Sequence, residues 1–181
     1  YHHNRLEAYL PAAVALLDAG FVCTASLPCP AEMGASIHIS GTGSSIVDTV
    51  FVNRTTGALK PSTFPESATG LADLVRADLE LLKQGGVNPT AGDTRCVAFG
   101  HLTRLAIWNL REGWDAERPT GERLGTVSNW LKGFGGWEEV ERFLSPLSET
   151  TEQSVTKSPE SCTPTKLTLP MPNLNVWSRF H

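Results

Sequence analysis

Two apolar segments joined by a loop without a helical pattern constrain the fold more than any other feature of this sequence. Residues 21–27 are rich in aromatic and β-branched side chains, which predicts a strand that ends at Pro28 and Pro30. Residues 45–54 contain a dense apolar run, which predicts a second strand buried on both faces. Strands joined without a helical crossover are usually antiparallel, so we expect these two strands to pair in that way.

A helix is predicted immediately before the first strand, over about residues 5–19. Apolar side chains recur there at helical spacing, and Gly20 supplies the residue of positive φ that often follows a helix. Asn4 is the expected N-cap, with Glu7 three positions later as in a capping box. Pro11 lies inside the pattern, so we expect the helix to kink or restart there.

Beyond residue 56 the pattern changes first to helices and then to a polar tail. An apolar stripe predicts a helix that stops at Gly85, and a second helix follows with Asp93 as its candidate cap. Residues 120–145 suggest one or two short helices, whereas Ser, Thr and Pro dominate the segment that follows, which predicts disorder. The expected organisation is an α/β part over residues 1–56, a helical extension over 57–145 and a largely disordered tail over 146–181.

Charge and cysteine usage restrict the partners and the compartment. The chain has 181 residues and a formal net charge of -4, so its average field does not indicate a nucleic-acid partner, although a local basic patch remains compatible with it. The cysteines are scattered without a CxxC pair or zinc spacing, so we expect no metal site and free thiols in a reducing, cytoplasmic compartment. We see no apolar run of about 18 residues, so we expect no membrane span.

Short segments across the first third of the chain match the pattern of one enzyme family. They are Tyr1-His2-His3, Leu6-Glu7-Ala8-Tyr9, Ala19-Gly20-Phe21-Val22, Thr24 to Glu32 and Ser44 to Arg54. In these segments the chain resembles the C-terminal end of the catalytic domain of adenine-specific DNA methylases, the S-adenosylmethionine-dependent methyltransferases that carry an N-terminal domain of unknown function. The resemblance implies the end of a Rossmann-like α/β sheet: a helix, then two last strands, with the final strand inserted antiparallel.

The resemblance also implies an activity and a partner. Such enzymes transfer a methyl group from S-adenosylmethionine to adenine in DNA, and the family implies a role in modification or phage defence. This sequence contains neither a Gly-rich cofactor turn that opens a helix nor an Asp-Pro-Pro-Tyr element. Because the chain also begins with Tyr1 in place of Met, we expect the missing elements to lie upstream, and we expect no tight binding of S-adenosylmethionine by this chain alone.

Four residues are candidates for lining the pocket of the target base: His2, His3, Glu32 and Ser36. If Tyr1-His2-His3 ends a strand, the two histidines lie at the carboxyl edge of the sheet, where ligands of open α/β sheets bind. Glu32 and Ser36 lie in the loop between the strands, where they can contact substrate or a phosphate. The alternatives are two histidines that merely enter a helix and a solvated loop.

A second class of function rests on the helical half of the chain. Arginines accompany its tryptophans, and Arg with nearby Trp can grip a phosphate backbone and stack bases. Interleaved acids favour ordinary packing with a solvated rim, and His101 is expected to be packed or to cap a helix. The alternative function is a non-catalytic helical module that binds protein or nucleic acid. The arginines concerned are Arg95, Arg104, Arg111, Arg118 and Arg123.

Overall fold

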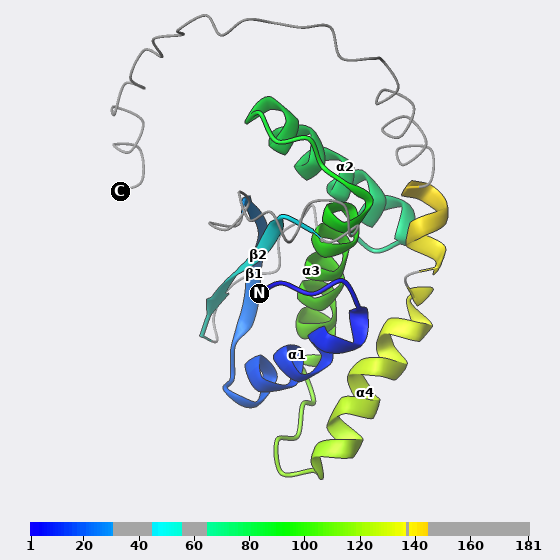
Figure 1. The fold of residues 1–181 in the computed structure, drawn as a ribbon. Helices are drawn as coiled ribbons and strands as arrows, with labels where there is room; N and C mark the ends of the chain where they lie inside the picture. The colour runs from blue at the N-terminus through cyan, green and yellow to red at the C-terminus, as the bar shows by residue number, and fades with distance from the viewer. Residues whose placement is uncertain (31–44, 56–64, 137, 145–181) are drawn as a thin grey trace, which may run out of the picture.

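The chain forms a mixed α/β structure in which two strands pair antiparallel and helices pack against them (Figure 1). This computed structural model describes residues 1–30, 45–55, 65–136 and 138–144, so the expected disorder of the tail falls outside the described residues. Residues 138–144 are helical. The other elements are a 3-10 turn over Leu6–Ala8, α1 (Tyr9–Asp18), β1 (Val22–Pro30), β2 (Val47–Arg54), α2 (Ala68–Gln84), α3 (Ala91–Leu110) and α4 (Thr120–Gly133).

The first predicted helix is divided, as Pro11 led us to expect. A 3-10 turn precedes α1, and Pro11 lies in the first turn of α1, where a missing N–H costs no helical hydrogen bond. The prediction that Asn4 is the N-cap is wrong, because the N-cap position is one residue further along the chain. Arg5 is the extended residue before the turn, and its backbone N–H donates to Nδ1 of His3 at 3.1 Å. Gly20 has a φ of +78°, as predicted for the residue after this helix.

The antiparallel pairing of β1 and β2 is confirmed, but β1 does not end at the prolines. It runs through Pro28 to Pro30, and Pro28 lies opposite Thr49 of β2. The backbone N and O of Thr49 bond to Tyr1 on the other side of β2, at 2.7 and 2.8 Å. Pro28 therefore occupies a position where β1 makes no ladder bond to β2, and its missing N–H costs nothing.

The contact with Tyr1 gives β2 a partner on each side. Tyr1 donates its backbone N–H to Thr49 and accepts a hydrogen bond from the N–H of the same residue. Two bonds exchanged between one pair of residues are the pattern of an antiparallel ladder. β2 therefore lies between the first residue of the chain and β1.

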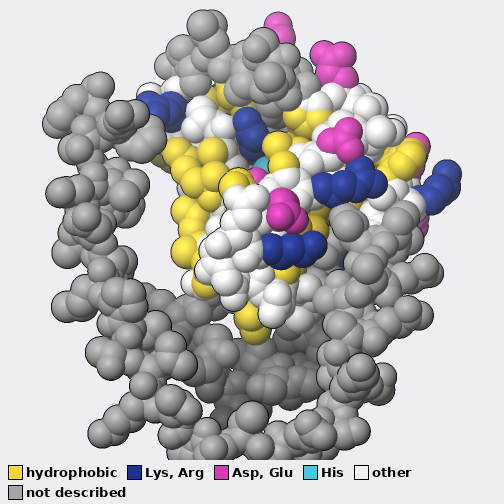
Figure 2. Space-filling model, turned by 90° about the horizontal axis from the view of Figure 1, so that it is seen from above, with side chains coloured by type: hydrophobic (Ala, Val, Ile, Leu, Met, Phe, Trp, Pro, Cys, Tyr) yellow, Lys and Arg dark blue, Asp and Glu magenta, His cyan; other side chains and the backbone are white. Residues whose placement is uncertain are grey.

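The prediction that β2 is buried on both faces is wrong. Val47 and Thr49 are buried beneath the helices, whereas Val50 is 45% exposed. Its register partner Leu27 is 49% exposed, so the apolar face that these two residues share is open. Figure 2 shows hydrophobic side chains at the surface on the side where the strands lie in Figure 1.

Helix α3 is the centre of the fold. It packs across β1 and β2 and also contacts α1, α2 and α4 (Figure 1). Gly100 makes the closest approach: a Cβ there would lie 2.4 Å from Oγ of Ser26 and 2.7 Å from Cγ2 of Thr49. The absence of a side chain at this position allows α3 to lie directly on the sheet.

The start of α3 is fixed by a capping box, one turn earlier than predicted. Thr90 is the N-cap, and Asp93 is the third helical residue, whose side chain bonds back to the N–H of Thr90 at 2.7 Å. The carboxylate of Asp93 is fully buried and also accepts hydrogen bonds from Oγ of Ser45 and from the N–H of Ile46, both at 2.7 Å. It therefore joins the start of α3 to the chain that enters β2.

The helices beyond residue 65 share one hydrophobic core with the sheet. Buried residues of α1, both strands, α2, α3 and α4 form a single cluster. The stop of α2 at Gly85 and the helices within residues 120–145 are confirmed, since α4 and residues 138–144 fall in that range. None of the described helices is long and apolar enough to cross a membrane.

Candidate functional site

A small cavity of about 150 Å³ lies where the N-terminal segment meets the start of β2. Its lining consists of His2, His3, Asn4 and Ser45. The neighbouring Val47 pairs with Pro30, the last residue of β1, so the cavity adjoins the carboxyl end of that strand. We call this cavity the edge site.

His2 is held against β2 and remains partly open to solvent. Its Nδ1 lies 3.1 Å from the carbonyl O of Val47 and 3.3 Å from Oδ1 of Asp48. The His2 and Asp48 side chains are 38% and 42% exposed. Because Nδ1 is engaged with β2, Nε2 is the ring nitrogen that His2 can offer to a ligand.

His3 is positioned by the turn that follows it. Its Nδ1 accepts the N–H of Arg5, and its carbonyl O lies 3.3 Å from the hydroxyl of Tyr9. Tyr9 is fully buried, and burial raises its pKa well above the ordinary value, so the hydroxyl stays protonated and can donate. His3 therefore lies at the entry to the first helix, which was the alternative to its lining a pocket. It also lines the edge site.

The structure brings together only part of the predicted set of residues. His2 and His3 share one cavity, whereas Glu32 and Ser36 lie outside the described residues. Ser45 was missed by sequence reasoning, although its place immediately before a strand that returns to the same sheet edge was a usable signal. Its Oγ donates to Asp93 and accepts the N–H of Val47 at 3.0 Å, so its position is fixed.

Two tryptophans of the helical half, Trp108 and Trp114, have structural roles. Nε1 of Trp108 donates to the carbonyl O of Cys23 at 2.6 Å, and Nε1 of Trp114 donates to Asp18 at 3.0 Å. Asp18 also binds Arg123, and these contacts, led by the Trp114 hydrogen bond, lower the pKa of the Asp18 carboxyl. These groups tie α3 and α4 to the first helix and strand.

Most of the five arginines named from the sequence also bind within the molecule, and only Arg118 among them is exposed. Arg111 donates to the carbonyl O of Leu17, and Arg118 pairs with Asp115. Arg104 is partly buried, and its pKa is lowered by that burial. Arg95 is the exception among the five, because no described residue forms an ion pair or a side-chain hydrogen bond with it.

His101 is packed, as predicted. Its side chain is 3% exposed, and its Nε2 lies 2.7 Å from Oδ2 of Asp78 on α2. The pair therefore joins α2 to α3 inside the core. Its burial keeps it away from any ligand at the surface.

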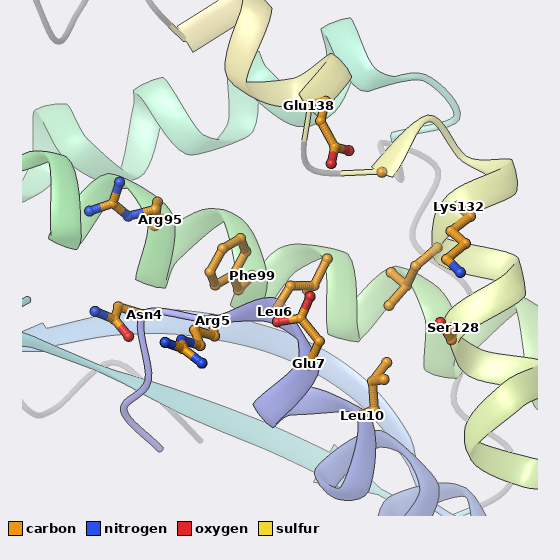
Figure 3. A pocket seen from close by; sticks show the side chains of 12 residues that line it. Asn4, Arg5, Leu6, Glu7, Leu10, Arg95, Phe99, Ser128, Lys132 and Glu138 are labelled. Carbon is orange, nitrogen blue, oxygen red and sulfur yellow. The ribbon is translucent and has the colours of Figure 1, made fainter. Parts of the chain in front are cut away.

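A second cavity adjoins the edge site, because Asn4 lines both. It has a volume of about 320 Å³, is partly open to solvent, and is lined mainly by the N-terminal turn, α3 and α4 (Figure 3). Arg5, Arg95 and Lys132 contribute to its wall. Sequence reasoning missed it because the three cations come from segments far apart in the chain.

The edge site offers imidazole, amide and hydroxyl groups rather than a metal-binding cluster. Within residues 1–30, 45–55, 65–136 and 138–144, no group of three or more His, Cys, Asp or Glu side chains is placed to share a metal ion. The arrangement can therefore bind a ligand by hydrogen bonds from His2 and Asn4. No protein-family model, curated protein or solved structure matches this chain.

Proposed function

We propose that this chain is the C-terminal part of an S-adenosylmethionine-dependent DNA methyltransferase that transfers a methyl group to adenine in DNA. In this proposal β1 and β2 are the last strands of a Rossmann-like sheet, and α2, α3 and α4 form an extension packed against it. The cofactor turn and the Asp-Pro-Pro-Tyr element are then supplied by other residues of the reading frame, because this sequence does not contain them.

The observation that carries the proposal is the position of β2 between Tyr1 and β1. The resemblance implies that the final strand is inserted antiparallel into the sheet. β2 pairs antiparallel with β1 on one side and exchanges two backbone hydrogen bonds with Tyr1 on the other. This order, with a helix between Tyr1 and β1, is what an inserted final strand requires, and it supports the proposal.

The edge site gives the proposal its candidate substrate contacts. His2 and His3 lie beside Ser45 at the carboxyl end of β1, the edge where open α/β sheets bind their ligands. An extruded adenine is recognised through hydrogen bonds to its edge. The exposed ring of His2 and the amide of Asn4 can make such bonds, so we assign them to orienting the base, with no role in methyl activation.

The test is methyl transfer from radiolabelled S-adenosylmethionine to unmethylated genomic DNA by the product of the complete reading frame. We expect label in adenine with the complete protein and none with residues 1–181 alone. His2→Ala should lower incorporation by roughly 10-fold or more if the ring binds the base. Lys83→Ala is the control, because it removes an exposed side chain paired with Glu80 and should leave the rate unchanged.

Absence of label with the complete protein contradicts the methyltransferase proposal. In that case the helical part becomes the better candidate, as a non-catalytic module that binds protein or nucleic acid. Micromolar binding of S-adenosylmethionine by residues 1–181 alone would contradict the placement of the cofactor site outside this chain.

A further inference from the structure

The 320 Å³ cavity beside the edge site has the size of a small-molecule site and is partly open to solvent. It lies between the turn at the start of the chain with the first turn of α1, the first half of α3, and the second half of α4 with the residues that follow it. Small-molecule pockets typically measure about 300–1,000 Å³. The cavity is therefore large enough for one ligand of modest size.

Positive charge is concentrated at one end of this cavity. Arg5 and Asn4 from the N-terminal segment lie at the same end as Arg95 from α3, and Lys132 lies at the opposite end (Figure 3). No described carboxylate forms an ion pair with any of the three cations, although Glu7 and Glu138 also line the cavity. Two unpaired arginines at one end favour an anion with several oxygens, because the guanidinium group matches the geometry of phosphate.

The wall between the two charged ends is apolar. Leu6 and Phe99 lie in the middle of the cavity (Figure 3), and Leu10 and Leu131 also line it. Phe99 is only 2% exposed, so the half-buried Leu6 and Leu10 present more of this apolar surface. Phe99 is held in place by an edge-to-face contact with Tyr9, at 5.8 Å between ring centroids. A flat, largely apolar group such as a nucleobase can be buried against such a wall, since base binding rests mainly on contact with aromatic and apolar side chains.

We propose that this cavity binds a nucleotide unit, with its phosphate at Arg5 and Arg95 and its base against the apolar wall around Leu6. The unit is either a free nucleotide or one residue of a single-stranded nucleic acid, because both present the same phosphate and base. This binding depends on the cavity alone and does not require the protein to transfer methyl groups.

The experiment measures binding by fluorescence anisotropy with a fluorescein-labelled hexathymidylate and by calorimetry with dAMP. The matched variants each lose two positive charges. One carries Arg5→Gln and Arg95→Gln in the cavity, and the control carries Lys83→Gln and Arg54→Gln at exposed positions outside the cavity lining. We expect the cavity variant to bind roughly 10- to 100-fold more weakly and the control to bind within about twofold of the unmodified chain.

Each outcome decides the proposal. Binding of the oligonucleotide alone supports it and identifies the source as nucleic acid, and binding of dAMP alone identifies a free nucleotide. Equal binding of inorganic phosphate and dAMP shows that no base is held and overturns it. Loss of affinity in both variants also overturns it, because the effect is then one of net charge, and so does the absence of binding by a chain with an unchanged melting temperature.

Discussion

Gly100 determines how closely α3 approaches the sheet, so a single methyl group there should be costly. Alanine raises helix propensity by up to about 1 kcal/mol. Its Cβ would however lie within 2.4 Å of Oγ of Ser26, and overpacking of this kind costs about 1–3 kcal/mol or more. We expect Gly100→Ala to lower the free energy of unfolding by about 1–2 kcal/mol, as measured by urea denaturation.

Gly125 is the matched control for this substitution. It lies inside α4, and a Cβ there meets nothing within 4 Å. Gly125→Ala should therefore stabilise the protein by up to about 1 kcal/mol through helix propensity alone. Equal effects of the two substitutions would show that the close contact at Gly100 is not formed.

The described cysteines differ in their exposure to solvent. Cys29 is exposed, whereas Cys23 and Cys96 are buried, and burial raises the pKa of the Cys23 thiol to about 12. In a Cys162→Ser chain at pH 8, we expect Ellman's reagent to modify one thiol rapidly and all three only after denaturation. Rapid modification of two thiols in the native chain would contradict the burial of Cys23 or of Cys96.

For single residues, effects on the local backbone were predictable from the sequence, whereas contacts between residues far apart in the chain were not. Gly20 and Pro11 act on their own backbone, so their effects follow from the residue type. The predicted cap at Asn4 was wrong because the start of the helix depends on the His3 ring, which accepts the backbone N–H of Arg5. Ser45 joins the edge site through contacts that cross 48 positions to α3, and no pattern within one segment specifies such contacts.

At the scale of elements, Asp93 is the link between α3 and β2. Its two oxygens accept two backbone N–H groups, those of Ile46 and Thr90, one on each oxygen. An amide has one accepting oxygen, so Asp93→Asn leaves one buried N–H without a partner. We expect a loss of about 1–3 kcal/mol in the free energy of unfolding, measured by urea denaturation.

Asp73→Asn is the control for the link. The Asp73 side chain is 68% exposed and pairs only with Arg76 on its own helix. Its replacement should change stability by less than about 0.5 kcal/mol. Similar losses in the two variants would mean that the general change of charge, rather than the buried link, determines the effect.

The pairing of the strands was predictable, but their surroundings were not. A loop without a helical pattern was sufficient to predict that β1 and β2 run antiparallel. The length of β1 depends on Tyr1. Because the backbone N–H and C=O of Thr49 bond to Tyr1, Thr49 makes no ladder bond to Pro28 opposite it, and β1 can continue through the proline. The exposure of Val50 depends on which face α3 covers, and an apolar run alone does not specify that.

For the whole molecule, two buried groups predict a loss of stability at alkaline pH. Burial raises the pKa of Cys23 to about 12 and raises that of Tyr9 above its usual value. In the unfolded chain these groups lose their protons near pH 8.5 and pH 10, whereas the folded chain retains them. Their contribution is therefore complete below about pH 8.5 and declines as the pH rises, with a slope of about 1.4 kcal/mol per pH unit for each group.

The measurement is the free energy of unfolding between pH 7 and pH 11, with Cys23→Ala as the comparison. The substituted chain is less stable at pH 7, yet its stability should fall less steeply between pH 9 and pH 10. Parallel curves for the two proteins would contradict the raised pKa of the Cys23 thiol.

The single core was the feature of the whole molecule least visible in the sequence. Apolar stripes predicted the individual helices, but not that α3 lies on the sheet with α1, α2 and α4 around it. Gly100 is what allows this arrangement, and a glycine inside a helical pattern has no unique meaning by itself.

The insertion of β2 beside Tyr1 has a consequence for the order of events during synthesis. Tyr1 and its partner Thr49 are 48 positions apart, and a ribosome adds about 5–20 residues per second. The backbone of Tyr1 therefore waits roughly 2–10 seconds for the residue that pairs with it. During this interval α1 and β1 are made. They therefore precede β2, the strand that joins them to the start of the chain. An unpaired strand edge is exposed for that time, and this nascent stage is the one at which we expect a chaperone to bind.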